Sequence, residues 1–339
     1  MHSSSRRQAL ALISGTVAAT CLPVPAVAAS RKIKVGALRF TSHAGSFAAF
    51  ERGYFADAGL NVEFKFFQAA QPMAVAIASG DIDYAITAVS GGLISLAEKG
   101  AIKIIGGALS EEKGIDGQLI LVSDAAFKAG ATSPKLLDGK TFGMTTAGSS
   151  FHYMASRIAA VEGIDLKFKP LQKVGAVIGA LKSGQIDAWS IVPHIAKGLA
   201  KSGQVHVIGK ISDYLPNYQV TTVFTSTRNA SDEKEMTKAF LSAYSRGVDD
   251  FNAAMVDKTA GDDGLNNMVD LIHKYVYADR PREKAAPSII NGSMRLNKDA
   301  ALNLTSLTDQ LDWFKSEKLV KPNISLETLV DSSYVEILK

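Results

Sequence analysis

The chain contains an internal duplication, and this feature limits its possible folds more than any other. Two copies match in order at an offset of about 104 residues. The chain of 339 residues has room for about two domains, so the duplication predicts two similar lobes. The matched pairs are IKVG at 33–36 with KTFG at 140–143, AGSF at 44–47 with AGSSF at 147–151, GLNVEF at 59–64 with GIDLKF at 163–168, and SGDID at 79–83 with SGQID at 183–187.

Each copy has the pattern of an α/β unit. A short apolar strand leads through a Gly/Ser turn into a helix, a glycine ends that helix, and a second strand and a second helix follow. The S-G-x-I-D motif then opens a third strand. Strands that alternate with helices run parallel, because the crossover helix returns the chain to the same edge of the sheet. The predicted fold is therefore α/β, with two doubly wound lobes joined by a hinge and a ligand in the cleft between them.

Segments outside the two copies complete the lobes. A further strand is expected at 102–108, and 118–123 has the pattern of the segment that leaves the first lobe. Beyond a strand at 220–226, a helical tail is expected to pack on the first lobe, with amphipathic helices at 233–252, 264–277 and 302–319. The predicted organisation is a signal peptide at 1–28, a first lobe from 29–123 plus 217–339 with the helical tail, and a second lobe from 124–216.

The first 28 residues have the pattern of a secretory signal. Arg6 and Arg7 precede an apolar run at 9–19, and AVA at 26–28 fits a cleavage site. The two arginines partly match a twin-arginine signal, but Ala9 stands where phenylalanine is usual, so the Sec route is favoured. The sequence therefore predicts a secreted protein; the family resemblance described below implies the periplasm.

Composition narrows the possible functions. The only cysteine, Cys21, lies in the predicted leader, so the mature chain would have no thiol for a disulfide, a zinc-thiolate site or a nucleophile. The formal charge of +4 falls to about +2 without Arg6 and Arg7, and the chain has no lysine- or arginine-rich run of the kind that nucleic-acid binding requires. No later segment is long and apolar enough to span a bilayer, so the mature chain is expected to be soluble.

The strand-to-helix turns are the expected ligand site. Open parallel sheets bind ligands beyond the carboxyl ends of their strands, where helix N-termini expose unpaired N–H groups. Residues 39–46 and 145–150 are the two equivalent turns, and both are rich in small polar residues. Gly143 to Ser150 match the phosphate-loop pattern except that Ser149 replaces the lysine, which argues against a nucleoside triphosphate. A neutral nest of donors remains, suited to a carboxylate, sulfonate, nitrate or polar ring edge; plain helix capping is the alternative.

Other polar and aromatic residues fall near the same rim. Arg39 ends an apolar strand and could pair with an anion, or it could be an ordinary surface arginine. Trp189 and His194 follow the second S-G-x-I-D motif, with burial in the lobe as the alternative. The residues expected to contact the ligand are Arg39, Thr41, His43, Gly45, Ser46, Gln68, Ser90, Thr145, Gly148, Ser149, Ser150, Phe151, Trp189 and His194.

Catalytic and metal motifs are weak. The chain has no G-x-S-x-G elbow and no G-x-G-x-x-G turn, and its two S-x-x-K matches, at 110–113 and 231–234, lack the companion motifs of serine hydrolases. His43, His152 and His194 fall near predicted turns and raise a zinc hypothesis, but no H-x-H or H-E-x-x-H spacing supports it. We expect neither an enzyme nor a resident metal or cofactor.

Three motifs carry a family resemblance over essentially the whole mature chain: ERGYFADAGLNV at 51–62, ASGDIDYA at 78–85 and LLDGKTFG at 136–143. Together they resemble periplasmic solute-binding proteins of the nitrate, sulfonate and taurine class, which also includes carriers of thiamine pyrimidine precursors and of aromatic acids. The resemblance implies a type II periplasmic binding protein fold. It also implies delivery of a small solute to the permease and ATPase of an ATP-driven (ABC) importer. Eukaryotic relatives that make thiamine pyrimidine carry a cysteine-rich motif, which the mature chain here could not form.

The resemblance leaves the solute open. Phe40, Phe151, Trp189 and Arg39 favour a small organic anion, such as a sulfonate or an aromatic or organic carboxylate. A thiamine pyrimidine precursor or a similar heterocycle is the alternative, and a related enzyme is a third hypothesis. The expected protein is a monomer that closes two lobes on its solute without making or breaking a bond, and it has no nucleic-acid partner.

Overall fold

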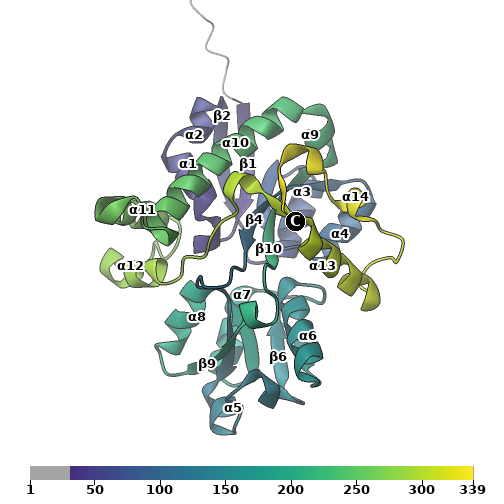
Figure 1. Ribbon diagram of the computed structural model, residues 1–339, viewed down its shortest axis with the longest axis vertical. Helices are drawn as coiled ribbons and strands as arrows, with labels where there is room; N and C mark the ends of the chain where they lie inside the picture. Colours follow the sequence, from purple (N-terminus) through teal and green to yellow (C-terminus); the bar gives the residue numbers. More distant parts are fainter. Residues whose placement is uncertain (1–30, 339) are drawn as a thin grey trace, which may run out of the picture.

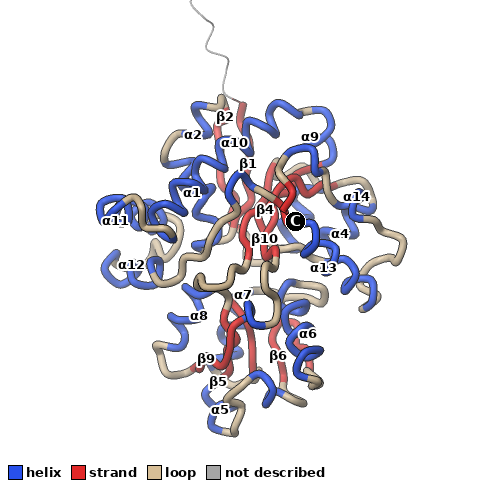
Figure 2. The backbone as a smooth tube through the Cα atoms, viewed as in Figure 1, coloured by secondary structure: helices blue, strands red, loops and turns tan. Residues whose placement is uncertain are grey.

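The computed structural model describes residues 31–338. Two five-stranded sheets lie one above the other along the long axis, each flanked by helices (Figure 1), and loops connect them across a narrow junction (Figure 2). The predicted signal peptide at 1–28, with Cys21, lies outside the described residues. In residues 31–338 no helix combines the length and the apolar character that crossing a bilayer requires.

The first sheet has the order β2-β1-β3-β10-β4, and the second has the order β7-β6-β8-β5-β9. The first sheet consists of β1 (Arg31–Ala37), β2 (Leu60–Phe66), β3 (Tyr84–Thr87), β4 (Ile102–Ser110) and β10 (Gln219–Ser226). The second consists of β5 (Leu119–Ser123), β6 (Thr141–Met144), β7 (Lys167–Pro170), β8 (Ala188–Ile191) and β9 (Val205–Lys210). The two orders are equivalent, as the duplication predicts, and the α/β fold class is confirmed.

One strand in each sheet runs against its neighbours, which differs from the expectation of wholly parallel sheets. β10 pairs antiparallel with β3 and β4, and β5 pairs antiparallel with β8 and β9. The chain passes between the sheets twice, at 111–118 and at 211–218. Because β4 and β9 end at the junction, β5 and β10 must start there and run away from it. Both antiparallel strands are therefore the crossing strands.

The first crossing also moves the expected boundary between the lobes. Residues 119–123 were expected to belong to the first lobe, but all five residues of β5 are buried between β8 and β9 of the second sheet. An apolar strand of this length buries both faces in the sheet where it finds two pairing partners. The second sheet therefore begins at Leu119.

Helices of the two copies cover the sheets at equivalent places. In the first copy they are α1 (Ala44–Glu51), α2 (Tyr54–Asp57), α3 (Ala70–Ala78) and α4 (Gly91–Glu98), with a 3-10 turn at Thr41–His43. In the second they are α5 (Asp124–Lys128), α6 (Ser150–Glu162), α7 (Val174–Lys182) and α8 (Pro193–Ala200), with 3-10 turns at Pro134–Leu137 and Ile211–Asp213. Gly163 ends α6 with a φ of 66°, a conformation that glycine adopts without strain.

The tail after β10 is helical, and it contacts both lobes. It contains α9 (Thr227–Asp232), α10 (Lys234–Phe251), a π-helical turn (Asn252–Val256), α11 (Gly261–His273), α12 (Arg282–Ile290), a 3-10 turn (Lys298–Ala300), α13 (Leu304–Ser316), α14 (Leu326–Leu329) and a 3-10 turn (Ser332–Tyr334), with a small sheet of β11 (Leu302–Asn303) and β12 (Ile337–Leu338). α10 packs on α1, as expected for a tail on the first lobe. α12, however, contacts α8 of the second lobe, and Trp313 of α13 lies 5.1 Å from the His152 ring of α6.

The sequence does not predict α12 because Pro287 lies inside it, and proline normally ends a helical pattern. α11 also begins and ends earlier than expected: it runs from Gly261 to His273, and Tyr277 has a φ of 61°. Burial of Ala285, Ala286 and Ile289 keeps α12 helical despite its weak amphipathic pattern.

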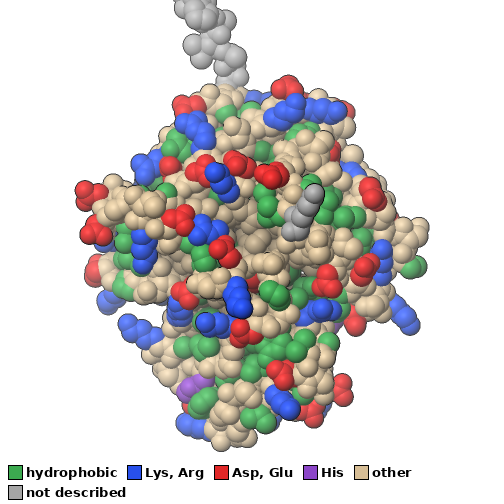
Figure 3. Space-filling model, viewed as in Figure 1, with side chains coloured by type: hydrophobic (Ala, Val, Ile, Leu, Met, Phe, Trp, Pro, Cys, Tyr) green, Lys and Arg blue, Asp and Glu red, His purple; other side chains and the backbone are tan. Residues whose placement is uncertain are grey.

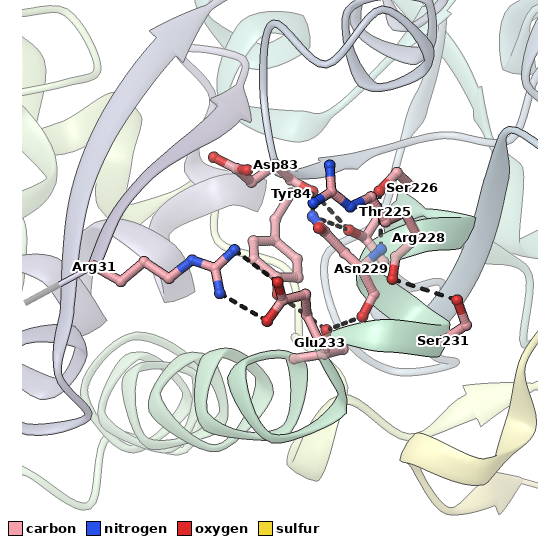
Figure 4. A network of polar contacts seen from close by, with 10 residues as sticks. Arg31, Asp83, Tyr84, Thr225, Ser226, Arg228, Asn229, Ser231 and Glu233 are labelled. Carbon is pink, nitrogen blue, oxygen red and sulfur yellow. Dashed lines mark hydrogen bonds and ion pairs between the residues drawn. The ribbon is translucent and has the colours of Figure 1, made fainter.

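A polar network closes the end of the first sheet that lies away from the second lobe (Figure 4). The Asn229 side-chain amide donates to the Asp83 carbonyl and to Thr225 Oγ1, both at 3.2 Å. Arg31 pairs with Glu233 through two contacts of 2.7 and 3.0 Å. These bonds fix α9 and the start of α10 to β1, β3 and β10.

Candidate functional site

A small cavity of about 50 Å³ lies between the two sheets, next to the crossing segments. Residues at or just after the ends of β1, β2 and β3 form much of its first-lobe wall, and residues at or after the ends of β6 and β8 form much of the second-lobe wall. The cavity is therefore at the carboxyl ends of the parallel strands of both sheets, where open α/β sheets bind ligands. Its apolar lining residues are Leu38, Phe40, Ala69, Ala70, Ala88, Leu109, Phe151, Val174, Ile191, Val192 and Val220; its polar ones are Ser42, His43, Thr87, Gln118, Thr145, Ser149, Ser150 and Thr221.

The lining contains no lysine, arginine, aspartate or glutamate among the described residues. Its polar groups are hydroxyls, one side-chain amide and one imidazole. An ion that enters such a cavity loses its hydration without gaining an opposite charge, which costs several kcal/mol unless dipoles replace the water. The wall is therefore better matched to an uncharged solute, or to one anionic group held at a helix N-terminus.

Ser149 carries a hydroxyl that the protein itself does not use. Ser149 is the N-cap residue of α6, but its side chain makes no capping bond, and its Oγ is buried without a hydrogen-bond partner among the described residues. Ser90 at the start of α4 behaves in the ordinary way, since its Oγ accepts a 3.2 Å bond from the Leu93 amide. A buried hydroxyl without a partner is costly, so Ser149 Oγ is available to a polar group that enters the cavity.

Thr221 supplies a second free hydroxyl from the first lobe. It lies on β10, is 7% exposed, and its Oγ1 is also buried without a partner within residues 31–338. Gln118, on the first crossing segment, adds a side-chain amide whose nitrogen lies 3.2 Å from the Met154 sulfur. The two free hydroxyls thus come from different lobes and line the same cavity.

His43 is held neutral in the cavity wall. Its Nε2 lies 2.7 Å from the Ile86 carbonyl oxygen, which can only accept, so Nε2 carries the proton and Nδ1 is an acceptor for the Ser42 hydroxyl at 3.3 Å. Burial lowers the pKa of His43 from 6.5 to about 4. His43 is therefore uncharged at neutral pH and adds no counter-charge for an anion.

Two aromatic rings line the cavity, one from each lobe. Phe40 follows β1, and Phe151 lies in the first turn of α6. Trp189 does not reach the cavity; it is fully buried in the second lobe, with its ring centroid 5.2 Å from that of Phe151. Trp189 thus supports the lining rather than forming it. Thr145 and Ser150 complete the second-lobe turn that lines the cavity.

Arg39 lies outside the cavity, which corrects the expectation of an arginine pairing with an anion there. Its guanidinium stacks over the Phe66 ring at 3.8 Å and donates to the Tyr275 carbonyl at 3.1 Å, and the side chain is exposed. Arg39 ties the first lobe to the segment after α11. The turn after β1 directs Phe40, rather than Arg39, into the cavity.

Thr41 and His194 form a contact between the lobes. Thr41 Oγ1 lies 3.0 Å from the Gly292 carbonyl and 3.0 Å from His194 Nδ1. The single hydroxyl proton goes to the carbonyl, so Nδ1 carries the histidine proton and Nε2 is a bare acceptor. That Nε2 is buried without a partner among the described residues, and burial lowers the pKa of His194 to about 3.

The remaining expected residues lie near the cavity without lining it. Ser46 donates to the His43 carbonyl at 2.7 Å, and Gly45 packs against α10. Gln68 is exposed, and its carbonyl accepts a 3.4 Å bond from the Val174 amide across the lobes. Gly148 has a φ of 71°, and its carbonyl accepts a 3.0 Å bond from the Gly91 amide, also across the lobes. Ser90 caps α4, as described above.

The three histidines of the zinc hypothesis have separate partners. His152 Nδ1 accepts a 3.2 Å bond from the Gly148 amide, while His43 and His194 bond Ile86 and Thr41. Within residues 31–338, no group of three or more histidine, cysteine, aspartate or glutamate side chains is arranged to hold a metal ion.

The sequence does not single out Thr221 and Gln118, although both line the cavity. Gln118 lies just before β5 and Thr221 lies near the start of β10, and nothing in the local pattern distinguishes them from interior residues of a strand. The duplication indicates indirectly that the crossing segments lie near the site. A segment that leaves one copy for the other must pass through the junction where the turns of both copies meet.

Comparison with known proteins matches residues 40–254 to the NMT1/THI5-like family model. Comparison with curated protein sequences finds no significant match. Among solved structures, the alkanesulfonate-binding protein of Xanthomonas axonopodis pv. citri bound to MOPS has a TM-score of 0.70 at 16% identity, covering 89% of this chain and 98% of that one. The periplasmic nitrate-binding protein of Synechocystis PCC 6803 has a TM-score of 0.65 at 14% identity, with coverage of 88% and 83%.

A Candida albicans gene product described as having the generic periplasmic binding protein structural fold is also similar, with a TM-score of 0.67 at 17% identity and coverage of 91% and 99%. At these identities the structures establish the fold alone. The periplasmic binding protein fold expected from the three sequence motifs is thereby confirmed.

Proposed function

Because the chain belongs to the NMT1/THI5-like family and has the periplasmic binding protein fold, we propose that it is the solute-binding component of an ATP-driven importer. In this role it works in the periplasm as a monomer, and the importer's permease and ATPase are its partners. Residues 31–110 with 219–338 form one closing body and 119–210 the other, with 111–118 and 211–218 as the hinge. The cavity supports this assignment, because both bodies contribute walls to it.

The solute that fits the cavity best is a small uncharged aromatic or heterocyclic molecule with polar atoms at opposite edges. The observation that carries this proposal is the lining itself, which has two aromatic rings, two free hydroxyls from opposite lobes and no charged side chain. A ring between Phe40 and Phe151 would bury apolar surface, while Ser149 and Thr221 would bond its polar atoms. This class includes thiamine pyrimidine precursors.

An aromatic carboxylate or sulfonate is the second candidate, and one observation favours it. α6 has 13 residues, and Ser149 leaves its first-turn amides without a side-chain cap. Those amides and the positive end of the helix dipole can hold one anionic group without a cationic side chain. The anion would then lie at Ser149, far from Arg39.

Paired ligands separate the two candidates. Benzamide and benzoate have nearly the same shape and differ in charge, and a pyrimidine amide and the corresponding acid form a second pair. The solute class that binds should raise the unfolding temperature, with about 2.7 kcal/mol of stabilisation at 100 times Kd. Stabilisation by the neutral members alone supports the first candidate, and stabilisation by the acids alone supports the second.

Two variants link any stabilisation to the cavity. S149A and T221V each remove one free hydroxyl and should weaken binding about tenfold, while S90A removes a capping hydroxyl outside the cavity and should leave Kd unchanged. Mass spectrometry of the solute after incubation shows whether the protein only binds it or converts it. Recovery of unchanged solute is the expected result. A converted product would overturn the transport proposal in favour of the enzyme hypothesis.

A further inference from the structure

A groove on one flank of the molecule carries an excess of positive charge and is built from both lobes. It has a volume of about 640 Å³ and runs between α8 of the second lobe and α12 of the tail. Lys197 and Lys201 line it from the α8 side, and Arg280 and Lys284 line it from the α12 side. Glu283 is the only acidic residue in its lining.

Most of this charge is not neutralised within the described residues. Lys197 pairs with Asp116 and donates to the Asn291 carbonyl at 2.7 Å, which bridges the two sides of the groove. The Arg280 guanidinium lies 4.3 Å from the centre of the Tyr277 ring. In residues 31–338, Lys201 and Lys284 are exposed and form no ion pair. Three cations thus face the groove against one carboxylate, Glu283.

The opposite flank of the lobe junction shows that this excess is local. There α13 meets α6, and the charges are paired: Arg157 lies 3.8 Å from Asp309, and Lys315 lies 3.7 Å from Asp312. The Tyr153 hydroxyl also donates to Asp309. Lysine and arginine side chains gather along the boundary between α12 and α8 in the space-filling view (Figure 3).

We propose that this groove binds an acidic segment of a partner protein, and that it does so only while the lobes are together. The inference rests on the proposed function, in which that partner is the membrane component of the importer. Charge complementarity selects an acidic segment, and the concave shape between two helices fits an inserted chain better than a flat lipid surface. Since one wall belongs to each lobe, opening of the lobes would separate the cations and weaken the site.

Charge reversal tests the groove. The probe is a fluorescein-labelled oligoglutamate peptide, whose binding to the full mature chain is followed by anisotropy at low salt. K201E/K284E should weaken binding about tenfold or more, and raising the salt should weaken binding to the unmodified chain. K135E/K182E is the control matched in charge, because Lys135 and Lys182 are exposed outside the groove and form no ion pair among the described residues.

Each outcome decides the proposal. A selective loss in K201E/K284E, with tighter peptide binding when the stabilising solute is present, supports it. Equal losses in K135E/K182E and K201E/K284E would show non-specific attraction and overturn it. Binding to anionic-lipid vesicles with the same charge dependence, without peptide binding, would overturn it in favour of a membrane surface. Solute binding, measured on the same variants by thermal shift, should be unchanged, so failure of the groove leaves the proposed function intact.

Discussion

The two equivalent turns of the duplication have the same origin in sequence and different roles in the structure. At the first turn, Ser46 donates to the His43 carbonyl, and Gly45 is packed under α10. At the second turn, Ser149 keeps a free hydroxyl and faces the cavity. The tail causes part of this difference, because α10 packs closely along α1, whereas α13 meets α6 through side chains such as Trp313 and Asp309.

The same contrast extends beyond the turns. Polar groups at the far end of the first sheet, around Asn229, are bonded to one another (Figure 4). Several buried polar atoms near the cleft lack partners among the described residues, including those of Ser149, Thr221, His194 and Glu111. Thr227 of α9 and Tyr244 of α10 also carry such atoms, so the contrast is one of degree. Unpartnered buried groups weaken a fold, and those that line the cavity can regain a bond from a molecule that enters it. Four predictions test this contrast, beginning with the largest effect.

The packed first turn should not tolerate a larger residue at Gly247 of α10. A Cβ there would contact the Gly45 carbonyl and lie 2.5 Å from the Ala49 amide nitrogen, and backbone atoms cannot move aside cheaply. G247A should lower the free energy of unfolding by about 3 kcal/mol, measured by urea denaturation. G179A is the control, because a Cβ at Gly179 in α7 meets nothing within 4 Å. It should stabilise the chain by up to about 1 kcal/mol, and equal losses in both variants would contradict the prediction.

Glu111 should make stability depend on pH. Burial raises the pKa of its carboxyl from 4.5 to about 7, although Oε1 accepts a 3.0 Å bond from the Gln118 amide. The folded state therefore holds this proton more tightly than the unfolded state, and stability should fall as pH rises from about 4.5 through 7. E111Q should remove on the order of 2–3 kcal/mol of this dependence.

Unfolding of E111Q and of the unmodified chain at several pH values between these limits measures the effect. E283Q is the control, because Glu283 is exposed and in residues 31–338 forms no ion pair. Parallel pH profiles for E111Q and the unmodified chain would show that Glu111 is not the titrating group.

The two N-cap serines should separate stability from binding. S90A loses the bond to the Leu93 amide and should cost about 1 kcal/mol of stability, with an unchanged Kd for the solute. S149A loses no bond within the described residues and should change stability by less than about 0.5 kcal/mol, while Kd rises about tenfold. Denaturation and solute titration of both variants provide the readings, and a stability loss in S149A as large as that in S90A would refute the contrast.

Arg39 should have the smallest effect. R39A removes an exposed stacking contact with Phe66 and should lower stability by no more than about 1 kcal/mol. Because the side chain lies outside the cavity, solute affinity should stay within about twofold, as measured by calorimetry. A large loss of affinity would place an anion at Arg39 and restore the expectation drawn from the sequence.

Several features could be predicted because they follow from local pattern. The α/β alternation, the doubled sheet order and the helix that opens at Ser150 all reflect strand and helix periodicity or a turn residue. The chain also places Thr145, Ser149, Ser150, Phe151 and His43 in the cavity lining, as positions at strand-to-helix turns suggest. The sequence did not predict helix α12, the position of Arg39 outside the cavity, or the lining residues Thr221 and Gln118. Each of these depends on a contact with a segment distant in sequence.

By itself the sequence determined two copies of one α/β unit, since the spacing of apolar residues and glycines acts over a few residues at a time. The tertiary structure alone decided which copy presents free hydroxyls to the cavity and which is sealed by α10. It also decided that the crossing strands supply Gln118 and Thr221 to the wall. Those outcomes depend on packing between segments separated by a hundred residues or more, and no local periodicity records such contacts.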